Sequence, residues 1–115
     1  MWRVGSTVDF DVWFSALDRD AREEVAVAVE LLKHRGPLLS RPWADTLKGS
    51  RFANMKELRV NAKRLAIRIA FAFDTKRNAL LLVAGDKRGI NQALFYRRLI
   101  ARADALFEDH LRKLR

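Results

Sequence analysis

This 115-residue chain contains no cysteine, only two prolines, two histidines and one tyrosine, and no long apolar run. The absence of cysteine excludes disulfides and thiol chemistry and is compatible with the cytoplasmic location that we expect. No apolar stretch approaches the roughly 20 residues that a membrane-spanning helix needs, so we expect no membrane association. Asp9 and Asp11 lie where a signal peptide would carry its apolar segment, which argues against export.

Metal and cofactor motifs are also missing. The sequence has no His, Asp or Glu spacing typical of a metal site and no glycine-rich phosphate loop. His34 and His110 both lie outside the basic segment described below, which argues against a histidine acid–base pair. We therefore expect neither a metal nor a cofactor.

Positive charge is abundant and unevenly distributed. Lys and Arg number 23 against 14 Asp and Glu, a net charge of +9. The acidic residues gather between Asp9 and Glu30, whereas Glu57 is the lone acid between Lys48 and Arg68. A small domain this basic predicts a polyanionic partner. The alternative is a solvated cationic surface that only aids solubility.

The N-terminal half predicts one strand and two helices. A weak strand spans Trp2–Val8, and the apolar period becomes helical from Asp9. Asp18 or Asp20 can cap a second helix, which ends at a cationic turn followed by Gly36 and a proline. We expect these helices to form an antiparallel hairpin on a sheet.

The C-terminal half predicts a meander and a final helix. Pro37–Asn54 lacks periodicity and is expected to be a long connection. Strands are predicted at Met55–Val60, Leu65–Asp74 and Ala79–Gly85, joined by the turn-like sequences NAK and TKRN. An amphipathic helix follows from Asn91. The predicted fold is a single α+β domain over residues 1–115, with a mainly antiparallel sheet of about four strands.

The sequence RLAIRIAFAFD, residues 64–74, carries the strongest functional signal. Strand alternation places its large apolar residues on one side and Arg68 on the other, with Ala66, Ala70 and Ala72. Alanines around one cation make a poor core surface. They are a plausible floor for a shallow site in which a phosphate contacts the guanidinium.

The neighbouring strand supplies residues to the same face. With simple pairing, Glu57 and Arg59 project beside Arg68, a glycine turn brings Lys87 to the edge, and Lys48 lies within reach. A carboxylate within a ring of cations suits RNA cleavage by the 2′-hydroxyl, because cations stabilise charge on the phosphate oxygens. Glu57 is the one obvious proton acceptor in this set; its alternative role is a surface ion pair with Arg59 or Arg68.

The sequences LKGSRFANMKELR, RIAFAFD and LLVAGDK, in that order before a terminal helix, resemble toxins of the RelE/HigB superfamily, especially its phage-derived Gp49-like branch. The resemblance implies a RelE-like small RNase-type fold and the toxin of a type II toxin–antitoxin system. Such a toxin enters the ribosome, cleaves mRNA and inhibits translation. The implied partners are the ribosome, mRNA and a HigA-like helix-turn-helix antitoxin, with operator DNA bound only through the antitoxin.

The resemblance also assigns roles to individual residues. Arg68 matches the strand arginine that stabilises the scissile phosphate, whereas Glu57 departs from members with lysine there. The expected catalytic residues are Arg68, Glu57, Lys87 and Arg59. The expected RNA-binding residues are Lys48, Arg51, Lys56, Arg88 and Tyr96, the last as a looser match to a stacking tyrosine.

Two alternative functions stay open. One is a ParE-like toxin that inhibits DNA gyrase without nuclease chemistry, although such relatives lack the basic site. The other is a non-catalytic nucleic-acid-binding module. Trp43 and Phe52 in the basic loop could stack on bases, but aromatic residues in a long loop more often pack onto their own domain.

Overall fold

The computed structural model describes residues 1–62 and 64–115, which form three α-helices, one short 3-10 helix and a five-stranded sheet. In chain order, the elements are β1 (Val4–Ser6), α1 (Val8–Ser15), α2 (Arg19–Arg35), η1 (Gly36–Leu38), β2 (Ala44–Thr46), β3 (Lys56–Ala62), β4 (Leu65–Phe73), β5 (Ala79–Asp86) and α3 (Gln92–Lys113).

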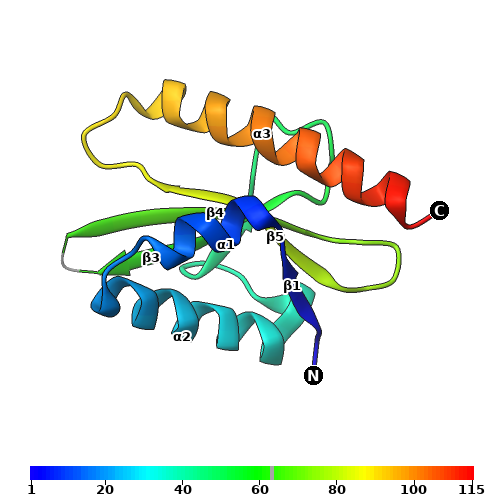
Figure 1. The fold of residues 1–115 in the computed structure, drawn as a ribbon, viewed down its shortest axis with the longest axis horizontal. Coiled ribbons are helices and arrows are strands. Elements are labelled where there is room, and N and C mark those ends of the chain that lie inside the picture. The colour runs from blue at the N-terminus through cyan, green and yellow to red at the C-terminus, as the bar shows by residue number, and fades with distance from the viewer. Residues whose placement is uncertain (63) are drawn as a thin grey trace.

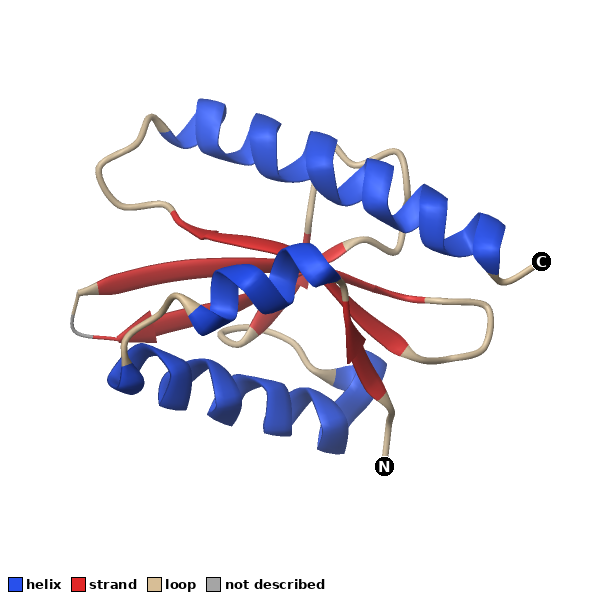
Figure 2. Ribbon diagram, viewed as in Figure 1, coloured by secondary structure: helices blue, strands red, loops and turns tan. Residues whose placement is uncertain are grey.

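The sheet is the middle of three layers (Figures 1 and 2). Its strand order is β1-β5-β4-β3-β2; β1 pairs with β5 in parallel, and the other pairs are antiparallel. Helices α1 and α2 cover one face and α3 covers the other. On the first face, Ile67, Ile69 and Phe71 pack with Val25 and Leu32. None of the helices in the described part of the chain is long and apolar enough to cross a membrane.

Side-chain caps and one glycine set the helix ends. Thr7, Asp18 and Asn91 each accept a hydrogen bond from a backbone N–H in the first turn of α1, α2 and α3, at 3.0, 2.8 and 3.0 Å. Gly36 ends α2 with a φ of 53°, and a Cβ there would lie 2.3 Å from the Trp2 indole nitrogen. This helix end therefore requires glycine.

The predicted α+β class is confirmed, with five strands where about four were expected. The additional strand β2 lies inside the predicted connection Pro37–Asn54, and its three residues are too few to show periodicity. Strand β3 takes in Asn61 and Ala62 of the predicted NAK linker, while Lys63 lies outside the described residues. Strand β1 is shorter than Trp2–Val8.

The expectation of a shallow alanine floor around Arg68 is wrong. Ala70 and Ala72 are fully buried beneath α3, where they pack with Leu99, Phe107 and neighbouring residues. Small side chains suit this face because they let a helix with large apolar residues lie close to the sheet. The same packing places the Arg68 side chain in the interior.

Candidate active site

Strands β3 and β4 bring the predicted catalytic residues together. Arg59 lies directly opposite Arg68, and Glu57 lies opposite Ala70. Opposed residues share a face, so all three polar side chains project toward α3, as the alternation predicted. The register therefore confirms the predicted placement of Glu57 and Arg59 beside Arg68.

Arg68 is buried, with 2% of its surface exposed. Its Nη1 donates to Asn61 Oδ1 at 2.9 Å and to the Ile67 carbonyl at 2.8 Å. Its Nε lies 3.8 Å from Glu57 Oε1, which is too long for a hydrogen bond, and has no hydrogen-bond partner among the described residues. A buried donor without a partner is costly, so the guanidinium is suited to accept an anion.

Glu57 is also buried, at 5% exposure, and joins the two arginines. It accepts a hydrogen bond from Arg59 Nη1 at 3.1 Å and one from the Tyr96 hydroxyl at 2.8 Å. Burial, followed by the hydrogen bond to Glu57, raises the pKa of Tyr96. Tyr96 therefore stays a phenol at neutral pH and acts as a hydrogen-bond donor.

Lys87 lies at the rim of this cluster, in the turn after β5. Its backbone N–H donates to the Ala66 carbonyl at 3.0 Å, and its ammonium lies 3.5 Å from Gln92 Oε1 at the start of α3. Partial burial lowers the pKa of Lys87, and the nearby charges of Arg68 and Arg59 lower it further. Lys87 thus gives up its proton more readily than an ordinary lysine.

Gly85 sets the distance between the sheet and α3 at this site. It lies opposite Arg68 in the β4–β5 register, and a Cβ there would come 3.0 Å from a ring carbon of Phe95. Phe95 in turn packs edge-on against Tyr96, with ring centroids 5.3 Å apart. The absence of a side chain at Gly85 lets the helix that carries Tyr96 approach the buried arginine.

The remaining predicted RNA contacts are spread around the molecule. Lys48 is exposed in the loop after β2, where Gly49 packs next to Ile100, one turn beyond Tyr96 on α3. The other three side chains have protein partners elsewhere: Arg51 with Glu108, Lys56 with the Pro37 carbonyl on the opposite face, and Arg88 with Asp86. The structure therefore brings Tyr96 into the cluster, but not Arg51, Lys56 or Arg88.

Asn61 belongs to the site and was missed in the sequence, where it was part of a predicted linker. Continuing the period of two from Glu57 and Arg59 would have placed it on the same face. Within residues 1–62 and 64–115, no group of three or more His, Cys, Asp or Glu side chains could hold a metal ion. His34 is exposed on α2 near Glu30, and His110 contacts Asp74, so both lie outside the cluster as predicted.

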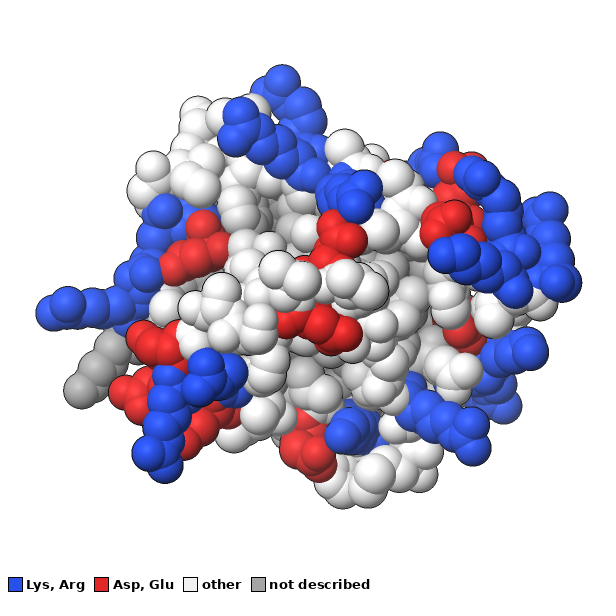
Figure 3. Space-filling view, viewed as in Figure 1, with Lys and Arg blue, Asp and Glu red and all other residues white. Residues whose placement is uncertain are grey.

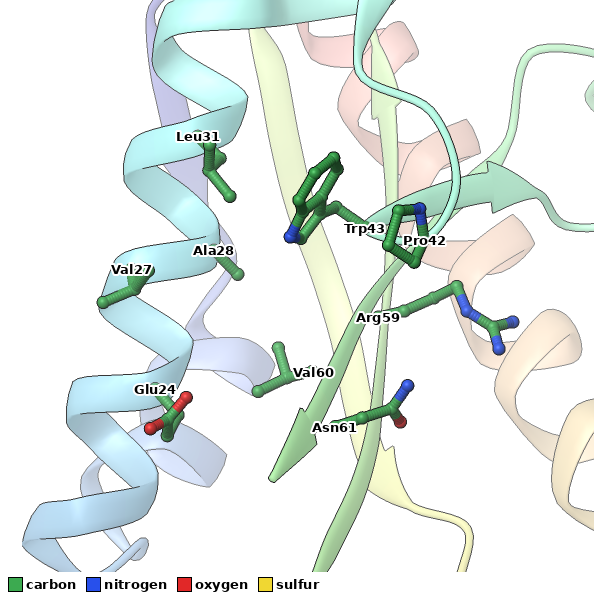
Figure 4. A pocket seen from close by; sticks show the side chains of 9 residues that line it. All are labelled: Glu24, Val27, Ala28, Leu31, Pro42, Trp43, Arg59, Val60 and Asn61. Atoms are coloured by element: carbon green, nitrogen blue, oxygen red, sulfur yellow. The ribbon is translucent and has the colours of Figure 1, made fainter. Parts of the chain in front are cut away.

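Of the two aromatic residues in the loop between η1 and β3, Phe52 packs within the protein and Trp43 lies at the surface. The Phe52 ring meets Phe107 edge-on at 5.0 Å. The Trp43 ring lies beneath the guanidinium of Arg35, with 39% of the residue exposed. Trp43 also lines a cavity between α2 and the edge of β3 (Figure 4).

The arrangement suits binding and polarisation of a phosphate. Three cations surround one carboxylate and one phenol in a partly desolvated setting, where charge interactions are stronger than in water. The chemistry available is anion binding by Arg59, Arg68 and Lys87, with proton acceptance by Glu57.

Similarity to known proteins covers the whole cluster. The family model described as phage-derived Gp49-like protein matches residues 12–108. The chain is 44% identical over 112 residues to HigB2, a candidate toxin of Mycobacterium tuberculosis, with 94% of this chain and 55% of HigB2 covered. It is 48% identical over 99 residues to HigB3, a candidate toxin of the same organism, with 86% and 84% covered. The chain spans little more than half the length of HigB2. From these matches, the chain belongs to the phage-derived Gp49-like family, which includes relatives named as toxins.

Proposed function

We propose that this chain is the toxin of a type II toxin–antitoxin pair and acts as a ribosome-dependent mRNA endonuclease. The toxin-named relatives and the net charge of +9 support this proposal. The observation that carries it is the buried Arg68 guanidinium, whose Nε lacks a hydrogen-bond partner among the described residues, within a cluster of further cations.

The proposed reaction is an internal displacement at phosphorus. The 2′-oxygen of the substrate bonds to the adjacent phosphorus as its proton passes to the Glu57 carboxylate. The bond from phosphorus to the 5′-oxygen breaks, and Lys87 supplies a proton to that oxygen. The products are a 2′,3′-cyclic phosphate and a 5′-hydroxyl. Arg68 and Arg59 stabilise the charge that develops on the phosphate oxygens.

The composition of the site supports the proposed dependence on a ribosome. A general base contributes on the order of 10² to 10⁴ in rate, and a site built mostly from cations gains the rest from electrostatics and substrate positioning. Positioning of the mRNA by the ribosome would supply the alignment that this small site does not impose by itself.

The decisive experiment is induced expression of the wild type and Arg68→Ala, with growth measured and mRNA 5′ ends mapped. We expect growth arrest and new 5′-hydroxyl ends for the wild type, and loss of both for Arg68→Ala. Arg102→Ala is the matched control, because Arg102 pairs with Asp9 away from the cluster. Arrest without cleavage would favour a gyrase inhibitor, and an equally mild effect of both substitutions would favour plain nucleic-acid binding.

A toxin of this family implies a cognate antitoxin. We propose that this partner is a HigA-like helix-turn-helix protein encoded beside the toxin, and that operator DNA is contacted only through it. Co-expression of the adjacent gene should restore growth in cells that produce the wild-type chain. Continued growth arrest would exclude that gene product as the antitoxin.

A further inference from the structure

One edge of β3 continues beyond its neighbour β2. The pairing of β2 with β3 covers only Lys56, Glu57 and Leu58, and the Arg59 N–H donates to the Trp43 carbonyl at 2.7 Å. Beyond Arg59, β3 pairs with β4 as far as Ala62, and no described residue pairs with the other edge of β3. The N–H and C=O groups of alternate residues point to the same edge of a strand. The Arg59 N–H points to the β2 edge, so the backbone N–H and C=O of Asn61 point to that edge too. An open edge of this kind can accept an added strand.

The side of this edge that faces α2 is a groove with an apolar wall and a polar rim (Figure 4). Its volume is about 210 Å³. Val27, Ala28, Leu31, Trp43 and Val60 form the apolar wall, and Arg59 and Asn61 of β3 lie at the rim. Val27 is 60% exposed and Trp43 is 39% exposed, so much of this apolar surface is uncovered. Glu24 also lines the groove, which disfavours acidic side chains on this side.

The side that faces α3 is more strongly cationic, because it carries the cluster of Arg59, Arg68 and Lys87. The nearby acids are already paired: Glu57 bonds Arg59, and Asp45 contacts Arg41 at 2.8 Å. In Figure 3, by contrast, Asp and Glu gather over the start of α2. The two sides of the open edge therefore favour different side chains.

We propose that the edge of β3 from Arg59 to Ala62 binds an extended segment of a partner protein in which apolar and acidic residues alternate. Successive side chains of a strand point to opposite faces, so the apolar residues enter the groove beside Val27 and the acidic residues cover the cations. The segment thereby lies against Arg59 at the rim of the phosphate site and inhibits the chain. This inference rests on the proposed function at one point, because it identifies the partner as the neutralising antitoxin.

Charge argues against a second copy as the occupant. Edge-to-edge pairing of two chains would bring Arg59 of each copy close to the other, and each copy carries a net charge of +9. An acidic partner segment meets no such repulsion.

The test uses the full chain and a synthetic eight-residue peptide that alternates valine and glutamate. The control peptide has four valines followed by four glutamates, and thus the same composition and charge. We expect the alternating peptide to bind at least tenfold more tightly and to slow hydrogen exchange at the Asn61 amide at least tenfold, as measured by NMR. Equal binding of both peptides, or protection of the opposite edge at the Ser6 amide, would overturn the proposal.

Two matched variants test the groove. Val27→Glu places a charge in the apolar wall and should weaken binding of the alternating peptide at least tenfold. Val12→Glu makes the same change on α1, where Val12 is 64% exposed, and should leave binding unchanged. Equal effects of the two variants would contradict a groove-specific contact. A concentration-dependent dimer that protects Asn61 without peptide would replace the partner segment with a second copy.

These measurements are independent of cleavage. If the chain cuts no mRNA but the alternating peptide protects Asn61, the docking edge stands and the proposed nuclease function fails. If the chain cuts mRNA but the peptides bind equally, the nuclease stands and the docking edge fails.

Discussion

Arg59 and Arg68 lie directly opposite each other on β3 and β4, and Glu57 lies beside both, with its carboxylate 3.1 Å from Arg59 Nη1 and 3.8 Å from Arg68 Nε. Like charges in directly opposed positions destabilise a sheet, and both arginine side chains are largely buried here. The carboxylate therefore holds together a pair that would otherwise repel.

Glu57→Ala should consequently lower stability as well as activity. Removing one partner of a buried ion pair costs about 3 to 5 kcal/mol, because it leaves buried charge uncompensated. Urea denaturation at pH 7 measures the loss. Glu108→Ala is the control, since Glu108 pairs with Arg51 and Arg112 at the surface and should matter much less. Equal losses for the two variants would show that Glu57 has no special structural role.

Arg68→Lys should fail to restore cleavage although it keeps the charge. The guanidinium donates to Asn61 and the Ile67 carbonyl while Nε points toward Glu57 at 3.8 Å, and an ammonium group cannot reproduce that fork. We expect cleavage on purified, programmed ribosomes to fall on the order of 100-fold. Wild-type rates for the lysine variant would mean that charge alone suffices.

Asn61→Ala tests whether the anchor of Arg68 matters. Asn61 is exposed, so the fold should persist, but Arg68 Nη1 would lose one of its two acceptors. Misplacement of a reacting group by about 1 Å can cost on the order of 100-fold, so we expect a loss of cleavage between tenfold and 100-fold. Asn54→Ala, at an exposed asparagine that bonds the Phe73 carbonyl, should cleave normally.

The pH dependence of cleavage should reveal Lys87. A general acid must be protonated, so the rate falls as the pH rises through its pKa, and burial and the two arginines lower that pKa for Lys87. The alkaline decline should therefore begin below the range of an ordinary lysine. Lys87→Arg should remove this decline from the accessible range, because arginine stays protonated. An identical profile for both proteins would exclude Lys87 as the acid.

The contact between Asp74, at the start of the β4–β5 turn, and His110 of α3 should be sensitive to acid. Burial alone would raise the pKa of Asp74, but hydrogen bonds from His110 and from the backbone of Asn78 and Lys76 bring it below the ordinary value. A lowered folded-state pKa stabilises the protein above the unfolded value of about 3.9 and loses this contribution as the pH falls below it.

Asp74→Asn should accordingly destabilise the protein by about 1 to 3 kcal/mol at pH 7. The difference from the wild type should shrink as the pH is lowered below about 3.9 in denaturation curves. A difference that is constant with pH would assign the effect to packing instead of charge.

The sequence was sufficient for much of the site because the period of two in β3 and β4 fixes which side chains share a face. Glu57, Arg59 and Arg68 were therefore predictable together. The burial of Arg68 was not, because alternation does not reveal that α3 covers the alanine face. The partners of Arg51, Lys56 and Arg88 were not predictable for a similar reason, because tertiary structure sets them; RNA binding by these residues stays a prediction.

Gly85 has a consequence for how this site can vary. Because a methyl group at Gly85 would come 3.0 Å from a ring carbon of Phe95, alanine there requires the ring or α3 to move slightly. Lifting α3 would lengthen the hydrogen bond between Tyr96 and Glu57, two residues that position 85 does not touch through a side chain. The distance between α3 and the sheet thus affects the hydrogen bond that holds Glu57, and the glycine at position 85 favours a short distance.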